Sequence, residues 1–367
     1  MISTQPVTRG LIAPTDVLAV DDLQVSYRSD RGEVRAVGGV TFGLKPGERL
    51  GLVGESGCGK TTTALAIMRL IRPPGRIVGG RILLRDGGGE IDLASLSDER
   101  MRRTRLSEVA LIPQGSMNSL NPVKRIGDHF ADSIQAHERR VPDSEIRDRT
   151  ADVLKMVGLR ESTAKLFPHE LSGGMKQRVC IALSITLSPK VIIADEPTSA
   201  LDVVVQRHVM ETLGAVQQRL NAAVILVGHD MGLLAQFVDR LGVMYAGKLV
   251  ELAPIKDLFE NPLHPYTRLL ISSLPTLDQR GTFRGVPGLP PSLLNPPVGC
   301  LFAPRCPSVM ERCSVETPPL QEVAPGHWAA CHLYRTTAVP VVTAVVAANE
   351  TEMPRDAGGH NGLPYRE

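Results

Sequence analysis

The strongest chemical signal in this sequence is a glycine-rich loop, Gly54 to Thr61, that ends in a lysine and a threonine. Its pattern is G-x-x-x-x-G-K-T, the arrangement that cradles the phosphates of a nucleotide. An apolar segment at 49–53 precedes the loop, and residues 62–70 carry the apolar spacing of a helix. A strand, a glycine loop and a helix in this order are the context that the motif requires.

The chemistry of this loop follows from its backbone. Glycines let successive N–H groups turn toward a polyphosphate, and the N-terminus of the following helix adds partial positive charge. Lys60 is then expected to reach the β- and γ-phosphates, and the Thr61 hydroxyl is expected to ligate Mg²⁺. The alternative is a glycine turn that binds nothing. We predict that a nucleoside triphosphate contacts Gly54, Glu55, Ser56, Gly57, Cys58, Gly59, Lys60, Thr61 and Thr62.

Two adjacent carboxylates, Asp195 and Glu196, end the apolar segment 191–194. In phosphate-loop enzymes an Asp at the end of such a strand holds Mg²⁺, and a Glu beside it is placed to orient or deprotonate the attacking water. The alternative is a carboxylate pair that caps the next helix. His229 follows another apolar segment, 224–228, where it could donate to the γ-phosphate or serve as a structural histidine.

A second pair of glycines, Gly173 and Gly174, follows Ser172 at the start of a helix that we predict to run to Leu187. Ser172 is a good N-cap, and the glycines leave the first N–H groups of the helix open, which makes a second anion site. A simple helix cap is the alternative. Tyr27 ends an early predicted strand and could stack on a purine, although by itself a surface or core tyrosine is the favoured interpretation.

Composition bounds the class of protein. The 367 residues are enough for two domains, or for one large domain with an appendage. A net charge of +2 and an aromatic content of 4% argue against nucleic acid as the main partner. Residues 1–16 contain no apolar run of signal-peptide length, so we expect no export. We expect a protein of the cytosol or one held at a membrane by its partners.

Four of the six cysteines cluster late in the chain with the spacing C-x5-C-x6-C-x17-C. Four thiolates can hold tetrahedral zinc or an iron–sulfur cluster, and the spacing does not choose between them. The remaining alternative, four cysteines left free or paired in disulfides, is less favoured than a metal site in a reducing compartment. The predicted ligands are Cys300, Cys306, Cys313 and Cys331.

The elements that position these residues are typical of an α/β core. Residues 116–170 are mostly helical in spacing and rich in charge, and we interpret them as a helical subdomain inserted into that core. The tail from about residue 336 is rich in Ala, Val and Pro and then in Gly, so we expect it to be mobile. Strands are predicted at 17–27, 36–44, 49–53, 81–84, 109–112, 191–195 and 224–228, followed by a hairpin with arms at 241–244 and 249–252.

Six motifs together resemble the ABC ATPase domain over residues 17–260. In chain order they are the phosphate loop, Gln114, the LSGGMKQR segment at 171–178, Asp195-Glu196, Asp202 and His229. The resemblance implies a P-loop ATPase whose domains pair head to tail, with each ATP held between one domain's phosphate loop and the other's LSGGMKQR signature. Ser172, Gly173 and Gly174 would then serve the ATP of a partner subunit.

The same resemblance implies roles for the remaining residues. Glu196 would be the general base, and His229 would sense the γ-phosphate. Gln114 would link Mg²⁺, the water and the transporter contact. Asp202 joins the nucleotide-binding residues, and Tyr27 matches the aromatic residue that stacks on adenine, which reverses the interpretation from the residue alone.

A closer resemblance concerns the region after residue 260. The segments NPLHPYT at 261–267 and NPPVGC at 295–300 look like the C-terminal extension of oligopeptide/dipeptide-permease ATPases, as does SLNP at 119–122. The run at 74–80 is closer to the "D" type of that subfamily. Departures are small: Gly115 stands where an acidic residue is usual, which puts details of the coupling contact in doubt, and Gly228 stands where Thr is common.

This subfamily resemblance implies an ATPase that powers import of peptides or a related small solute. It would sit on the cytoplasmic face of the membrane, under two transmembrane permease subunits and beside a second ATPase, usually a paralogue. An extracytoplasmic solute-binding protein would deliver the solute. Family members with the cysteine quartet are understood to carry a [4Fe-4S] cluster, so we expect a cysteine-clasped extension at 261–335 with Zn²⁺ as the alternative.

Functions of other classes fit less well. A soluble ABC ATPase of translation or repair is the alternative, but such translation factors usually carry two ATPase domains and the repair type a long coiled coil. A regulatory subunit without hydrolysis would need a broken catalytic set, whereas Lys60, Asp195, Glu196 and His229 are all present.

Overall fold

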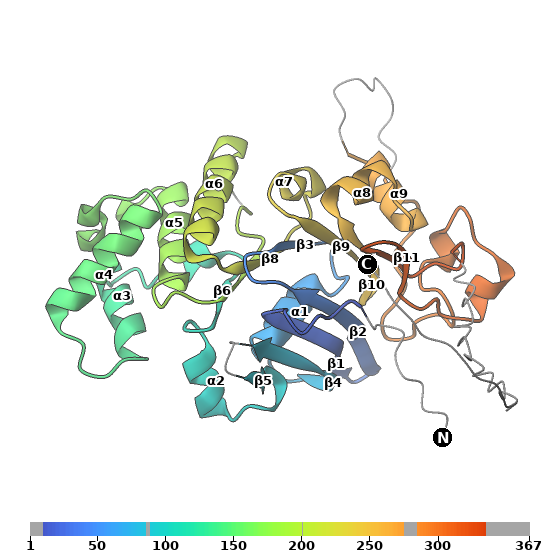
Figure 1. The fold of residues 1–367 in the computed structure, drawn as a ribbon, viewed down its shortest axis with the longest axis horizontal. Helices are drawn as coiled ribbons and strands as arrows, with labels where there is room; N and C mark the ends of the chain where they lie inside the picture. Colours follow the sequence, from blue (N-terminus) through green and yellow to red (C-terminus); the bar gives the residue numbers. More distant parts are fainter. Residues whose placement is uncertain (1–9, 86–88, 200, 275–284, 335–367) are drawn as a thin grey trace, which may run out of the picture. The chain divides into compact units, whose positions relative to one another are not determined.

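Two β-sheets carry this fold, and the apolar segments of the sequence form their strands (Figure 1). The computed structural model describes residues 10–85, 89–199, 201–274 and 285–334. Within these residues the larger sheet has eight strands in the order β11-β12-β10-β9-β3-β8-β7-β6, and the smaller sheet has four in the order β2-β1-β4-β5.

The larger sheet has a parallel centre. Strand β3 pairs in parallel with β8 and β9, and β7 pairs in parallel with β6 and β8. Strands buried on both faces read as continuous apolar runs, which explains the sequence of these segments. The bounds are β3 Arg49–Val53, β6 Val109–Ile112, β7 Val191–Asp195, β8 Ala223–Val227, β9 Arg240–Tyr245, β10 Lys248–Pro254, β11 Gln321–Ala324 and β12 His327–Ala329.

The smaller sheet is antiparallel and joins segments from both sides of the glycine loop. Strand β1 (Leu18–Ser29) pairs with β2 (Gly32–Leu44) on one side and with β4 (Gly75–Arg85) on the other. Strand β5 (Glu90–Asp92) extends the sheet from β4. The β4 strand begins earlier than the predicted segment 81–84, because Gly75 to Arg81 already pair with β1.

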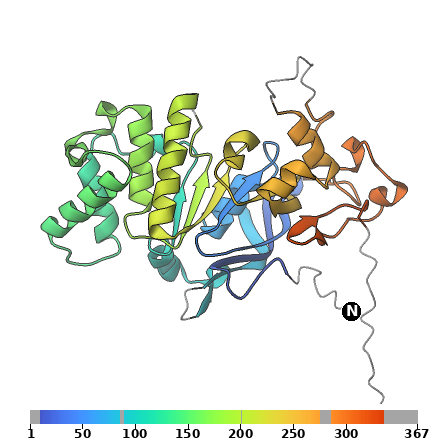
Figure 2. The same ribbon diagram turned by 45° about the horizontal axis from the view of Figure 1, so that its top comes forward.

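Helices cover the larger sheet and gather beyond its β6 edge (Figures 1 and 2). Helix α1 starts at Lys60, directly after the glycine loop. Helix α2 begins after the N-cap Ser97, whose side chain accepts from the N–H of Arg100. The bounds are α1 Lys60–Ile67, α2 Asp98–Thr104, α3 Ile126–Gln135, α4 Asp143–Met156, α5 Gly173–Ser184, α6 Val203–Leu220, α7 Met231–Ala235, α8 Ile255–Glu260 and α9 Pro265–Ser272.

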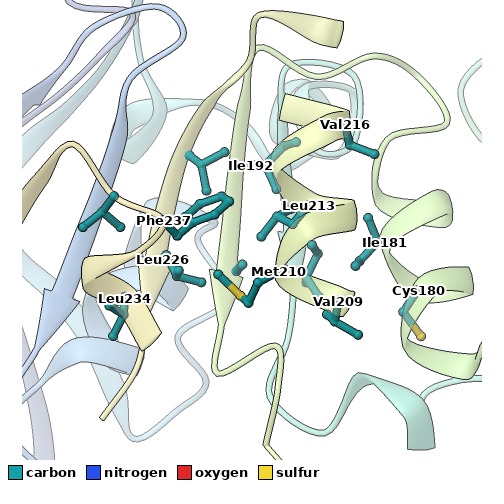
Figure 3. Close-up of a cluster of buried hydrophobic side chains, with 14 of the residues drawn as sticks. Cys180, Ile181, Ile192, Val209, Met210, Leu213, Val216, Leu226, Leu234 and Phe237 are labelled. Carbon is teal, nitrogen blue, oxygen red and sulfur yellow. The ribbon is translucent and has the colours of Figure 1, made fainter. Parts of the chain in front are cut away.

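Helix α6 anchors one face of the parallel sheet. Its side chains Val209, Leu213 and Val216 recur at helical spacing and belong to one buried cluster with Ile192 of β7 (Figure 3). Each such apolar side chain contributes roughly 1.5–3 kcal/mol when it is fully buried. This packing fixes α6 against the strand that carries the two carboxylates. Helix α6 was not among the elements predicted from the sequence.

Two strands close to the C-terminus of the described region complete the larger sheet. Strand β12 pairs with β10, and β11 pairs with β12. The sequence prediction contained neither strand. No described helix is both long and apolar enough to cross a bilayer. The predicted mobile tail, 336–367, lies outside the described residues.

Candidate active site

The glycine loop between β3 and α1 has a backbone that only glycine fits at two positions. Gly54 has φ 148°, and a Cβ there would lie 2.1 Å from the carbonyl oxygen of Met244. Gly59 has φ 102°, and a Cβ there would lie 2.5 Å from the carbonyl oxygen of Ala36. Both conformations are ones that side chains with a Cβ rarely adopt. The loop is therefore held tightly between β2 and the end of β9.

Lys60 lies inside this loop and is 6% exposed. Its ammonium group donates to the carbonyl oxygen of Gly54 at 2.7 Å and to that of Glu55 at 3.1 Å. The Cys58 thiol lies 3.7 Å from the same nitrogen, and burial raises the pKa of this thiol. A bound phosphate would offer the ammonium a charged acceptor in place of these carbonyls, and charge-assisted hydrogen bonds are the stronger ones.

Thr61 and Asp195 form a pair of oxygen ligands at the C-terminal end of β7. The Thr61 hydroxyl donates to Oδ1 of Asp195 at 3.1 Å. Asp195 is 2% exposed, and burial raises its pKa while the hydrogen bond from Thr61 and the charge of Lys60 oppose that rise. A carboxylate and a hydroxyl side by side are hard oxygen donors of the kind that Mg²⁺ prefers. The chemistry of this donor set fits Mg²⁺.

Glu196 follows Asp195 and is the centre of the predicted catalytic group. The Gln114 side-chain amide donates to Oε2 of Glu196 at 2.9 Å, and Nδ1 of His229 lies 3.5 Å from Oε1. These three residues follow the parallel strands β6, β7 and β8, whose C-terminal ends meet at one edge of the sheet. Glu196 itself has φ 47°, a left-handed conformation that is uncommon for a residue with a side chain.

A cavity of about 190 Å³ lies at this edge of the sheet, and Glu196, Ser199 and His229 are among its lining residues. A water molecule needs roughly 30 Å³ of liquid volume, so several waters fit there. The carboxylate of Glu196 is thus placed to contact a water and is oriented by an amide on its other oxygen. The arrangement can activate a water by accepting its proton.

The residues of the predicted signature lie at the N-terminus of α5 and do not line the cavity at Glu196. Ser172 is the N-cap of α5, where its hydroxyl accepts from the N–H of Met175 at 3.3 Å. Asp202 is the N-cap of α6 and accepts from the N–H of Val205 at 3.0 Å. A Cβ on Gly174 would lie 2.7 Å from Cγ1 of Val205, so the two helix N-termini are in close contact.

Ser172, Gly173, Gly174 and Asp202 line a cavity of about 830 Å³ that shares no lining residue with the cavity at Glu196. The chain therefore divides the predicted nucleotide residues into two groups. The first contains the phosphate loop and the carboxylates, and the second contains the signature and Asp202.

Tyr27 lies on β1, paired with Val34 of β2 and with Gly75 of β4. Its half-buried ring packs so closely on Gly75 that a Cβ there would lie 2.5 Å from Cε1 of the ring. The predicted stacking of this ring on adenine stays a prediction.

Sequence reasoning missed two residues that contact the phosphate loop. The Arg305 guanidinium pairs with the Glu55 carboxylate through two hydrogen bonds of 2.8 Å, although 250 positions separate these residues in the chain. The Tyr266 hydroxyl accepts from the N–H of Glu55 at 3.0 Å. Tyr266 lies in the segment 261–267 that carries the closer family resemblance, and Arg305 lies five positions after the segment 295–300. No motif or spacing indicates which residue either of them contacts.

The metal site that the sequence predicts at the four late cysteines is not confirmed. Cys313 and Cys331 are buried, Cys300 and Cys306 are half-buried, and all four are free thiols. They share one neighbourhood, since burial and then the charges of the other three raise the pKa of Cys331 to about 11. Even so, no three His, Cys, Asp or Glu side chains among the described residues are grouped closely enough to hold a metal ion. The geometry gives the predicted [4Fe-4S] cluster no support, and we derive no step through it.

Comparison with known proteins decides the family. Residues 37–199 match the model of the ABC transporter family, and residues 250–313 match that of the oligopeptide/dipeptide transporter C-terminal region. The probable peptide ABC transporter ATP-binding protein y4tR of Sinorhizobium fredii is 41% identical over 320 residues, which cover 86% of this chain and 94% of the relative. The chain belongs to the ABC transporter ATP-binding proteins of the oligopeptide/dipeptide group.

Other comparisons agree with this assignment to the ABC family. The dipeptide transport ATP-binding protein DppD of Caldanaerobacter subterraneus is 40% identical, covering 87% of this chain and 97% of the relative. The dimeric structure of the bacterial ABC transporter cassette MJ0796 matches with a TM-score of 0.57 and 26% identity, covering 65% of this chain and 98% of that cassette. The predicted family and the predicted α/β ABC ATPase fold are therefore confirmed.

Proposed function

We propose that this ABC protein hydrolyses ATP to power import of peptides or a related small solute through a membrane permease. The observation that carries this proposal is the contact of Gln114 and His229 with Glu196, beside the Thr61–Asp195 pair. That arrangement supplies a base for water next to a site for the triphosphate. Relatives described as peptide and dipeptide transport ATP-binding proteins support the nature of the solute.

Different residues of this chain would bind the triphosphate, hold Mg²⁺ and accept the proton of the attacking water. Lys60 and the loop N–H groups would bind and orient the triphosphate. Thr61, Asp195 and Gln114 would hold Mg²⁺, which neutralises phosphate charge when it is bound. Glu196 would accept a proton from the attacking water while the Gln114 amide holds its other oxygen in place. His229 would donate to the γ-phosphate.

We further propose that the active form pairs two ATPase subunits head to tail. Ser172, Gly173 and Gly174 do not line the cavity at Glu196. This separation favours the head-to-tail pair, because the three residues would then complete the site of the facing subunit. The partner would be a paralogue or a second copy. A dimeric relative of similar fold is known in MJ0796.

In the assembly that we propose, residues 17–260 form the ATPase domain, with a helical subdomain at 116–170 and an extension at 261–335. The pair of ATPases would lie on the cytoplasmic face of the membrane under two transmembrane permease subunits, served by an extracytoplasmic solute-binding protein. Helices α3 and α4 lie within residues 116–170 and support the proposed helical subdomain.

The proposal is tested by affinity purification of the tagged chain from detergent-solubilised membranes. Two polytopic membrane proteins should co-purify, and vesicles containing the complex should import a peptide library only with ATP. Recovery of the chain with ribosomes or DNA instead, and without membrane proteins, would favour the alternative of a soluble ABC ATPase of translation or repair.

An iron–sulfur cluster on Cys300, Cys306, Cys313 and Cys331 also stays a proposal, supported by the presence of four thiols in one neighbourhood and by the family resemblance. Anaerobically purified protein should then contain iron and labile sulfide and absorb near about 400 nm, with loss of that absorbance in Cys306→Ser. Zinc without iron would establish the alternative metal, and the absence of both would end the proposal.

A further inference from the structure

A buried arginine from the C-terminal region reaches the phosphate loop. Arg305 is 8% exposed, and its two terminal nitrogens each donate to a different oxygen of Glu55 at 2.8 Å. The same guanidinium donates to the Tyr245 hydroxyl at 3.2 Å and to the carbonyl oxygens of Pro287 at 2.7 Å and Val286 at 3.1 Å. All five of its N–H donors therefore have acceptors, which fixes the side chain in one orientation.

A second contact holds the backbone of the same loop residue. The Tyr266 hydroxyl accepts from the Glu55 N–H at 3.0 Å, and burial raises the pKa of Tyr266, so this hydroxyl stays protonated. The ring of Tyr266 packs on Tyr245 with 4.7 Å between centroids and on Phe302 with 5.3 Å. Glu55 is thus held by Tyr266 through its backbone N–H and by Arg305 through its carboxylate.

The negative charge of Glu55 is the reason that its ion pair with Arg305 affects nucleotide binding. Glu55 is the second residue of the glycine loop, and its side chain is still 25% exposed beside the place where a triphosphate would lie. A free carboxylate there would repel the phosphates. The Arg305 guanidinium neutralises that carboxylate through its two hydrogen bonds.

We propose that Arg305 is a positioning residue for ATP binding, and that the C-terminal region sets the nucleotide affinity of the phosphate loop through the Arg305–Glu55 pair. This inference rests on the proposed binding of ATP by that loop. It assigns to the C-terminal region an effect on nucleotide affinity within the same chain, in addition to any contact with other subunits.

The test compares Mg-ATP binding and steady-state hydrolysis for the full-length wild type and three variants. Arg305→Met should weaken ATP binding by roughly 10- to 100-fold, the effect of one unpaired charge about 6 Å from a phosphate at an effective dielectric constant near 20. The kcat at saturating ATP should stay within about threefold, since Arg305 contacts no reacting atom. Glu55→Gln alone should tighten ATP binding, because it leaves the positive charge of Arg305 without its partner beside the phosphates.

The double variant Glu55→Gln/Arg305→Met is the decisive measurement. It should recover most of the affinity lost in Arg305→Met, because the repelling carboxylate is gone. Arg312→Gln is the matched control: it removes an exposed ion pair with Glu316 in the same region and should bind ATP as the wild type does. Arg305→Gln, which keeps an amide in the buried position, takes the place of Arg305→Met if that variant does not fold.

Two outcomes would overturn the inference about Arg305, and a third would overturn the proposed function. Wild-type affinity in Arg305→Met would overturn the inference. Equal weakness of the single and double variants would also overturn it, because the arginine would then support only the local structure. Failure of the wild type itself to bind ATP would instead overturn the proposed function.

Discussion

Replacing Glu196 by glutamine is the sharpest test of the proposed chemistry. Glutamine has the same shape as glutamate and can still accept the hydrogen bond of 2.9 Å from the Gln114 amide through its own carbonyl oxygen. It cannot take a proton from water. The change therefore removes a base while it leaves the packing of the sheet edge and the phosphate loop intact.

The size of the effect follows from the geometry around the carboxylate. Two acidic residues, Glu196 and Asp230, line the cavity. Asp230 is the N-cap of α7, where its carboxylate accepts from the N–H of Leu233 at 3.0 Å, so Glu196 is the better placed of the two to reach a water. Loss of a general base costs about 10²–10⁴-fold in rate, which corresponds to roughly 2.7–5.5 kcal/mol in the activation free energy. ATP affinity should change by less than about threefold, because the phosphate-loop contacts persist.

Phosphate release at saturating ATP measures the turnover, and equilibrium binding of Mg-ATP measures the affinity. Both are followed over a range of protein concentrations, because the proposed site needs a second subunit. Glu260→Gln is the matched control: it neutralises an exposed carboxylate on α8 that lies 4.0 Å from the ammonium group of Lys256, and it should hydrolyse ATP normally. Turnover of Glu196→Gln within about threefold of wild type would refute the role of this carboxylate as the base.

Three further predictions concern other parts of the molecule. Lys60→Ala removes the ammonium from the loop and should abolish both Mg-ATP binding and ATP-dependent uptake; persistent binding would contradict its role. Gly174→Val introduces a branched side chain at a position where even a Cβ would lie 2.7 Å from Cγ1 of Val205. Hydrolysis should therefore fall at least about tenfold, while ATP binding by the isolated chain is unchanged. Burial lowers the pKa of His264 from 6.5 to about 4, partly opposed by Glu251, so its contribution to stability is complete above pH 6.5 and is lost as the pH falls toward 4. At pH 5 this loss lowers the free energy of unfolding by about 2 kcal/mol. Asparagine can also serve as an N-cap and does not titrate, so His264→Asn should reduce the fall in Tm between pH 7 and pH 5.

Local patterns predicted much of the nucleotide site. The glycines at 54 and 59 are required by the backbone conformation of their own loop, so their spacing is readable without any knowledge of the fold. The strand before the loop and the strand before Asp195 are continuous apolar runs for an equally local reason, since both faces of the parallel sheet are covered. Gln114 and His229 follow similar runs, and neighbouring parallel strands bring their ends to Glu196.

Other features depended on contacts between distant segments. Helix α6 begins with three consecutive valines, which do not follow the apolar spacing of an amphipathic helix, and its position is set by packing on β7 and β8. The short strands β11 and β12 are too brief to be recognised alone, and they exist because β10 offers an open edge. The cysteine spacing permitted a cluster, but the arrangement of the four side chains depends on the loops that carry them.

The sequence by itself determined that this chain binds a nucleoside triphosphate, because the residue types of a phosphate loop work through their immediate neighbours. Only the tertiary structure decided that Arg305 and Tyr266 hold Glu55 of that loop. The physical reason is that an ion pair between residues 250 positions apart leaves no periodicity or local propensity in the chain, and it forms only when the folded sheet brings the two segments together.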